Sequence, residues 1–153
     1  MDNKSAKKID YWMKGNKDAV MFILELSRII HLWDDLIDKD NPVTPVDINE
    51  AFWSLFFILP RNAFYMQNFS TLNPILMAAE LNWRTSNELE STGDEEDHRI
   101  AFIIRSAYVD AIQMSALLCG GREWAYTVSP EIRRWTHAEG FKSYMKDFEK
   151  GES

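Results

Sequence analysis

The sequence predicts an all-α fold, a compact bundle of about five main helices and two short ones. Apolar residues recur at spacings of three and four along most of the chain, which is the period of an amphipathic helix. Cap residues followed by proline, and a glycine pair, separate the periodic stretches. No stretch of the sequence alternates apolar and polar residues in the manner of a β-strand. Helices of this kind bury their apolar faces against one another, which favours a bundle.

The N-terminal residues are expected to form an arm before the first long helix. Residues 1–15 are polar, typical of a loose arm or a short helix, and residues 16–153 are expected to form one all-α domain. The helical period begins at about residue 16 and continues to about residue 40. Asn41 and Pro42 then end this helix, because the residue before a proline disfavours the helical conformation.

The next helix has a clear predicted start. Thr44 suits the N-cap position, Pro45 suits the first turn, and the helix is expected to reach about Leu59. Pro60 should end it. A short helix or turn is expected around residues 62–69.

Three further helices are expected in the second half of the chain. Asn73 and Pro74 should open the first of them, which extends to a break at residues 91–94. A long helix follows, with acidic residues in its first turn that suit the helix dipole. The glycine pair at residues 120–121 should end it.

The last helix is expected to begin at another cap-and-proline pair. Ser129 and Pro130 form this pair, after a short helical piece at residues 122–127. Gly140 is expected to interrupt the helix before the C-terminus.

Composition and charge exclude several classes of protein. The chain has 153 residues, of which 46% are apolar and 13% aromatic, too many for a disordered chain. The 24 acidic and 17 basic residues give a net charge of -7, which argues against nucleic-acid binding and repels anionic membranes. No run of about 18 apolar residues lacks a charge, so no transmembrane helix is expected.

The cysteine content and the N-terminus bear on the compartment. Cys119 is the only cysteine, so the chain forms no internal disulfide, and Cys119 is expected to be a small buried hydrophobe. The first residues are polar and lack an apolar signal segment. We therefore expect a cytoplasmic protein that binds neither nucleic acid nor membranes.

An acidic segment lies at the end of the first long helix. Asp34, Asp35 and Asp38 are three and four residues apart, so they share one sector of the helix. Carboxylates this close repel one another unless a cation lies between them, and such hard oxygen ligands suit Mg²⁺ or Mn²⁺. The alternative is a solvated acidic face at the helix end. His31 is either a further ligand or, as we favour, a hydrogen-bonded core histidine.

A second polar stripe lies on the helix expected to start at Pro74. Asn82, Ser86 and Glu90 are four residues apart and so lie on one face. An amide oxygen, a hydroxyl and a carboxylate in a row can chelate one hard cation. Short patterns of this kind also arise by chance.

Together the two segments resemble the class I isoprenoid (terpenoid) synthases, an all-α superfamily. Those enzymes carry an Asp-Asp-x-x-Asp helix and a facing Asn/Asp-x-x-x-Ser/Thr-x-x-x-Glu helix. The matching positions of this sequence are Asp34, Asp35 and Asp38 in the first motif and Asn82, Ser86 and Glu90 in the second. The resemblance implies Mg²⁺ ions held between the two helices on the diphosphate of a small-molecule substrate.

Arg105 has two alternative roles in this hypothesis. As a catalytic residue it would bind and steady the diphosphate, since a guanidinium contacts phosphate oxygens in pairs. Alternatively it forms a buried salt bridge with Asp34 or Asp35, which we favour because an unpaired buried charge is costly. His98 and His137 show no partner in the sequence and are expected to be exposed.

A rival resemblance is to the all-α nucleoside triphosphate pyrophosphatases, which hold Mg²⁺ on Glu-x-x-Glu and Glu-x-x-Asp helices. Tyr108, Val109 and Asp110, followed by an apolar run to Gly120, resemble the second of these helices. The chain as a whole also resembles small phage-encoded proteins, which implies no activity.

Two functional hypotheses follow from the sequence. The first is a Mg²⁺-dependent protein that binds or acts on a small molecule carrying a diphosphate. The second is a non-enzymatic structural or interaction protein. In that case the six tryptophans and the other aromatic residues supply the core and the surface of a homodimer or another oligomer.

Overall fold

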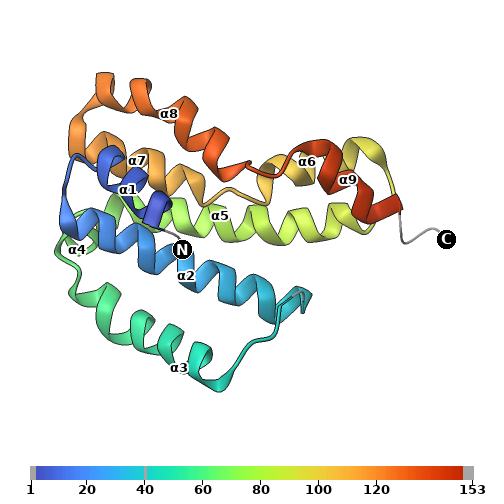
Figure 1. Cartoon of the computed structure of the whole chain (residues 1–153), viewed down its shortest axis with the longest axis horizontal. Coiled ribbons are helices and arrows are strands. Elements are labelled where there is room, and N and C mark those ends of the chain that lie inside the picture. The colour runs from blue at the N-terminus through green and yellow to red at the C-terminus, as the bar shows by residue number, and fades with distance from the viewer. Residues whose placement is uncertain (1–2, 40, 150–153) are drawn as a thin grey trace. The chain divides into compact units, whose positions relative to one another are not determined.

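The structure is a computed structural model that describes residues 3–39 and 41–149. Within these residues every element is helical: nine α-helices, one π-helical segment and one 3₁₀ turn. The predicted all-α class is therefore confirmed. The chain divides into two compact units, Met1–Phe69 and Ser70–Ser153, and each unit is described by itself (Figure 1).

In unit 1 the helices gather around α2. The bounds are α1 Asn3–Trp12, α2 Lys17–Asp38, α3 Pro45–Trp53, a π-helical segment Ser54–Ile58, a 3₁₀ turn Leu59–Arg61 and α4 Ala63–Gln67. α2 contacts α1, α3 and α4, and Figure 1 shows α1 and α3 along different sides of it. α2 is therefore the centre of this unit.

The N-terminal helix α1 is part of the core of unit 1. Its polar sequence predicted a loose arm or a short helix, and the helix is what forms. Ile9, Trp12 and Met13 are completely buried. The backbone then turns at Gly15, whose φ of 72° a residue without a Cβ adopts at little cost.

Local capping sets the starts of α2 and α3. The Asn16 side chain accepts a hydrogen bond from the Ala19 amide at 3.0 Å. Thr44 and Asp47 cap each other: the Thr44 amide donates to Asp47 Oδ2 at 2.9 Å, and the Asp47 amide donates to Thr44 Oγ1 at 3.3 Å. Both starts agree with the sequence prediction, because a cap depends only on neighbouring residues.

The end of α3 differs from the prediction. A single helix to about Leu59 was expected, but the α-helix ends at Trp53 and continues as the π-helical segment and the 3₁₀ turn. Pro60 has no amide to donate to the carbonyl of Phe56, and in a regular α-helix its ring would clash with that carbonyl. This accounts for the change of helical type just before the proline.

α4 is fastened to α2 by a buried asparagine. Asn62 caps α4 by accepting from the Tyr65 amide at 2.8 Å, and its Nδ2 donates to the Asp18 carbonyl at 2.8 Å. Phe22 of α2 packs on Tyr65 with ring centroids 4.9 Å apart. These contacts join α4 to the first half of α2.

Unit 2 contains the remaining helices. Their bounds are α5 Phe69–Glu90, whose first residue belongs to unit 1, α6 Glu95–Ile104, α7 Val109–Gly120, α8 Arg122–Thr136 and α9 Phe141–Glu149. α8 packs along α7, and α9 packs on α6. Gly121, at φ 81°, ends α7 at the predicted glycine pair, and its amide donates to the Leu117 carbonyl at 2.8 Å.

The helix starts expected at Pro74 and Pro130 are wrong. Pro74 lies inside α5 and Pro130 inside α8. A proline has no amide hydrogen to donate to the carbonyl four residues earlier. Pro74 therefore leaves the Ser70 carbonyl without its helical donor, and Pro130 leaves that of Tyr126. Both of these residues are exposed, so water can satisfy the carbonyl and the helix continues.

The long helix expected after the break at residues 91–94 is two helices, α6 and α7, joined by a turn at residues 105–108. Residues 95–120 together are long and apolar enough to cross a membrane by length and composition, with 39% of the most apolar window buried within the structure. A core helix passes the same test. The completely buried side chains of Ala101 and Ile112 belong to this core.

Candidate functional site

The three aspartates of the first motif lie at the C-terminal end of α2. Asp34 and Asp35 are half-buried and Asp38 is exposed. Asp35 Oδ1 accepts a hydrogen bond from Asn41 Nδ2 at 2.6 Å, which ties it to the turn after the helix. Within residues 3–39 and 41–149, no group of three or more His, Cys, Asp or Glu side chains is arranged to hold a metal ion.

His31 is hydrogen-bonded, as favoured from the sequence, but it is not a core residue. Its Nδ1 lies 2.6 Å from the Ser27 carbonyl one turn earlier. The side chain is exposed on the surface of α2.

The second motif lies on α5, in unit 2, whereas the first lies in unit 1. Asn82 is half-buried. Ser86 is completely buried, and its hydroxyl donates to the Trp83 carbonyl of the same helix at 2.6 Å. The Ser86 hydroxyl proton is therefore directed into its own helix.

Glu90 belongs to a polar cluster inside unit 2. Its carboxylate accepts a hydrogen bond from the Tyr144 hydroxyl at 2.8 Å and lies 3.4 Å from Arg105 Nη1. The Arg105 guanidinium also lies 5.5 Å from the centroid of the Tyr144 ring. Burial, followed by the hydrogen bond to Glu90, raises the pKa of Tyr144. The ion pair that the structure gives Arg105 is thus with Glu90, and the cluster fastens α9 to the end of α5.

The expectation that His98 and His137 are exposed is wrong. His98 is buried against Phe148, with ring centroids 4.1 Å apart, and its Nε2 lies 3.1 Å from the Glu90 carbonyl. His137 is half-buried beside Phe102, and burial, then the neighbouring charge of Arg133, lowers its pKa. No local pattern predicts the burial of His98, because its ring partner Phe148 lies on α9.

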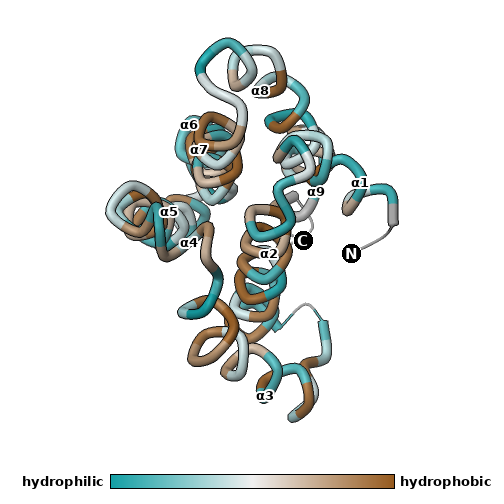
Figure 2. The backbone as a smooth tube through the Cα atoms, turned by 90° about the vertical axis from the view of Figure 1, so that its left-hand side faces the viewer, coloured by the Kyte–Doolittle hydropathy of each residue, from teal (hydrophilic) through white to brown (hydrophobic). Residues whose placement is uncertain are grey.

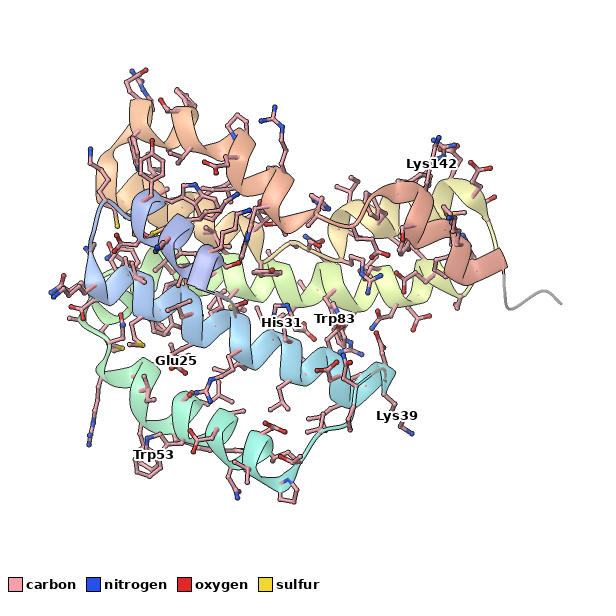
Figure 3. The ribbon with its side chains drawn as sticks, viewed as in Figure 1. Glu25, His31, Lys39, Trp53, Trp83 and Lys142 are labelled. Carbon is pink, nitrogen blue, oxygen red and sulfur yellow. The ribbon has the colours of Figure 1, made fainter. Side chains whose placement is uncertain are left out.

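A polar cluster joins α2 to the segment after α3. Ser54 is completely buried, and its hydroxyl donates to Glu25 Oε2 at 2.6 Å. Arg28 Nη2 donates both to Ser54 Oγ and to Glu25 Oε2, the latter at 2.6 Å. Figure 3 shows Glu25 between α2 and α3. Among the described residues every buried side-chain nitrogen and oxygen has a hydrogen-bond partner, so these groups are satisfied within the protein.

The opposite side of the same segment carries large apolar side chains in contact with water. We call Phe52, Trp53, Leu55, Phe56 and Phe57 the aromatic surface; their exposed fractions lie between 45% and 64%. Ring centroids are 4.6 Å apart for Trp53 and Phe57 and 6.0 Å apart for Phe52 and Phe56. Trp53 lies on the side of α3 away from α2 (Figure 3), and most of the stretch is hydrophobic (Figure 2).

The segment has an unusual distribution of residue sizes. It buries Ala51, Ser54 and Leu59 and leaves four rings exposed. The small Ala51 and Ser54 allow a close approach to α2, and the Glu25–Arg28 pair fixes Ser54 inward. This fixes the face that the segment turns away from α2. The rings are therefore held outward by the structure of unit 1.

The size of the aromatic surface exceeds what scattered surface residues produce. An aromatic side chain presents roughly 200 Å², so the exposed fractions leave about 450 Å² of ring surface. The largest contiguous apolar patch on a typical monomer is about 300–600 Å² and is often functional. The interaction hypothesis expected aromatic residues on an oligomer surface, but it did not place that surface at residues 52–57. Five bulky apolar residues among six consecutive positions are more than one buried face can hold, which is the signal that was missed.

Comparison of the chain with protein-family models, with curated proteins and with solved structures finds no match in any of the three. The functional conclusion therefore depends on the chemistry of the chain itself.

Proposed function

We propose that this protein is a non-enzymatic interaction protein that binds another protein through the aromatic surface of unit 1. The supporting observation is the outward orientation of four rings on a segment whose inward face is fixed by the Glu25–Arg28–Ser54 cluster. Aromatic side chains in a contiguous patch are the typical energetic centre of a protein–protein interface. Covering them with a partner removes apolar area from water, which favours association.

The Mg²⁺ and diphosphate function remains a prediction from the two motifs and ranks lower. Two groups of the second motif have partners inside unit 2, since the Ser86 hydroxyl donates to its own helix and Glu90 holds Tyr144 and Arg105. Recruiting Glu90 to a metal would cost these contacts. A cytoplasmic location likewise stays an expectation from composition.

Site-specific photocrosslinking in the cells that naturally make this protein tests the interaction function. A photoreactive phenylalanine analogue replaces Phe56, which is 64% exposed, and in the control it replaces Tyr126 of α8, which is 67% exposed. We expect a covalent adduct with a protein from position 56 and none from position 126. The absence of any adduct from position 56, or the same adducts from both positions, would contradict the proposal.

A further inference from the structure

We propose that the partner of the aromatic surface is a second copy of this chain, docked antiparallel about a two-fold axis between Leu55 and Phe56 of the two copies. This inference rests on the proposed function, that the surface binds a protein. It is carried by the charges that bracket the surface and by the area that two copies would bury.

The aromatic surface is bracketed by charges of opposite sign. Residues 51–60 carry no charge, and Glu50 and Arg61 stand at the two ends of this run. Glu50 lies in α3 and Arg61 ends the 3₁₀ turn after the π-helical segment, so the two charges stand at opposite ends of the uncharged run. The surface therefore has an acidic end and a basic end.

An antiparallel two-fold arrangement pairs these ends correctly. When two such segments run antiparallel, the acidic end of each lies beside the basic end of the other. Glu50 of each copy then lies beside Arg61 of the other, and two ion pairs close the interface. A parallel arrangement would instead place Glu50 beside Glu50 and Arg61 beside Arg61.

Both charged groups are accessible for such pairing. The Glu50 side chain is 58% exposed and contacts Arg28 Nη1 only at 3.7 Å. Arg61 is exposed and makes no ion pair within the part of the chain that the structure describes. Pairing across the interface therefore breaks no close contact of unit 1.

The area lies near the lower limit for a specific dimer. Two copies of the aromatic surface would bury about 900 Å² of ring surface together, before any contribution from Leu55 or from the polar edge. Specific interfaces begin at about 1,000 Å² in total. A second copy also offers the same apolar chemistry.

Sedimentation equilibrium of the whole chain, over a wide concentration range, tests this inference. The wild type is expected to approach twice the 17.9-kDa monomer mass. Phe56→Glu should leave only monomer, because it places a charge in the centre of the interface. Circular dichroism of each variant checks that the helical content is unchanged.

Charge exchange tests the antiparallel geometry. Glu50→Arg and Arg61→Glu should each weaken self-association by about tenfold or more, since each converts two attractive pairs into two repulsive ones. An equimolar mixture of the two variants restores opposite charges at both ends, and its association should return to within about threefold of the wild type. Glu123→Arg and Arg122→Glu, on exposed residues of unit 2, are the matched controls and should change nothing.

The outcomes separate this inference from the proposed function. A monomeric wild type whose Phe56 adduct contains a different protein overturns the second copy and keeps the interaction function. Binding of monomer to phosphatidylcholine vesicles, lost in Phe56→Glu, overturns both. A crosslink within one chain, which leaves the mass of the monomer, means that another part of the same chain covers the surface. That result overturns both the second copy and the interaction function. A dimer that is insensitive to the charge exchanges overturns the antiparallel pairing.

Discussion

Replacement of Tyr144 by phenylalanine tests the cluster that holds α9 in place. Tyr144→Phe keeps the buried ring and removes only the hydroxyl that donates to Glu90 at 2.8 Å. A hydrogen bond to a charged group contributes about 1.5–3 kcal/mol. Glu90 retains Arg105 at 3.4 Å, so its carboxylate is not left alone. We therefore expect a loss near the lower end of this range, about 1.5 kcal/mol in the free energy of unfolding.

Urea unfolding at neutral pH, followed by far-ultraviolet circular dichroism, measures this loss. Glu90→Gln and the double variant complete a mutant cycle, in which the coupling energy between the two side chains should be about 1 kcal/mol. A coupling indistinguishable from zero would refute the assignment of the cluster as the fastening of α9. Ser143→Ala, at an exposed neighbour on the same helix, is the control and should be neutral.

The same cluster gives a dependence on pH. Its surroundings raise the pKa of Tyr144 in the folded protein, so the folded state holds the phenolic proton more tightly than the unfolded chain does. The resulting stability is fully present below the unfolded pKa of about 10 and is lost as pH rises above it. The wild type should therefore lose stability above about pH 10 more steeply than Tyr144→Phe. Equal slopes for the two proteins would contradict this reasoning.

Three further predictions concern the core, the aromatic surface and the metal hypothesis. Ser54→Ala should destabilise unit 1 by about 1–2 kcal/mol in urea unfolding, because Glu25 and Arg28 lose the hydroxyl between them, whereas Ser70→Ala should be neutral. Phe22→Ala should lower the free energy of unfolding by about 3–5 kcal/mol. Phe56→Ala, measured on the monomer at high dilution, should lower it by less than about 1 kcal/mol. Equal losses would mean that the rings of the aromatic surface are buried. Millimolar Mg²⁺ with pyrophosphate should leave the midpoint of thermal unfolding unchanged, and a shift that Asp34→Ala abolishes would instead support the diphosphate function.

Local signals in the sequence predicted the fold class and most helix starts. The capping pair Thr44 and Asp47 involves residues three apart. Such contacts are set within one turn, so the sequence alone fixes them. Pro74 and Pro130 were misleading because a polar residue followed by proline is typical of a helix start, whereas here both prolines lie inside a helix.

The candidate site was harder to predict because it depends on contacts between distant residues. Glu90 meets Tyr144 across 54 positions, and no periodicity relates them. The orientation of the aromatic surface depends on Ser54, which reaches Glu25 across 29 positions. A pattern of apolar residues predicts that a helix forms, but which of its faces is buried is decided by the neighbouring helix.

Photocrosslinking from position 56 of the purified protein tests the central claim most directly, because Phe56 is the most exposed ring of the aromatic surface. We predict an adduct at twice the 17.9-kDa mass of the chain. The labelled chain should form no such adduct with an unlabelled partner that carries Phe56→Glu. If the purified protein yields only unmodified monomer from this position, and the experiment in cells also yields no adduct, the aromatic surface has no role in binding.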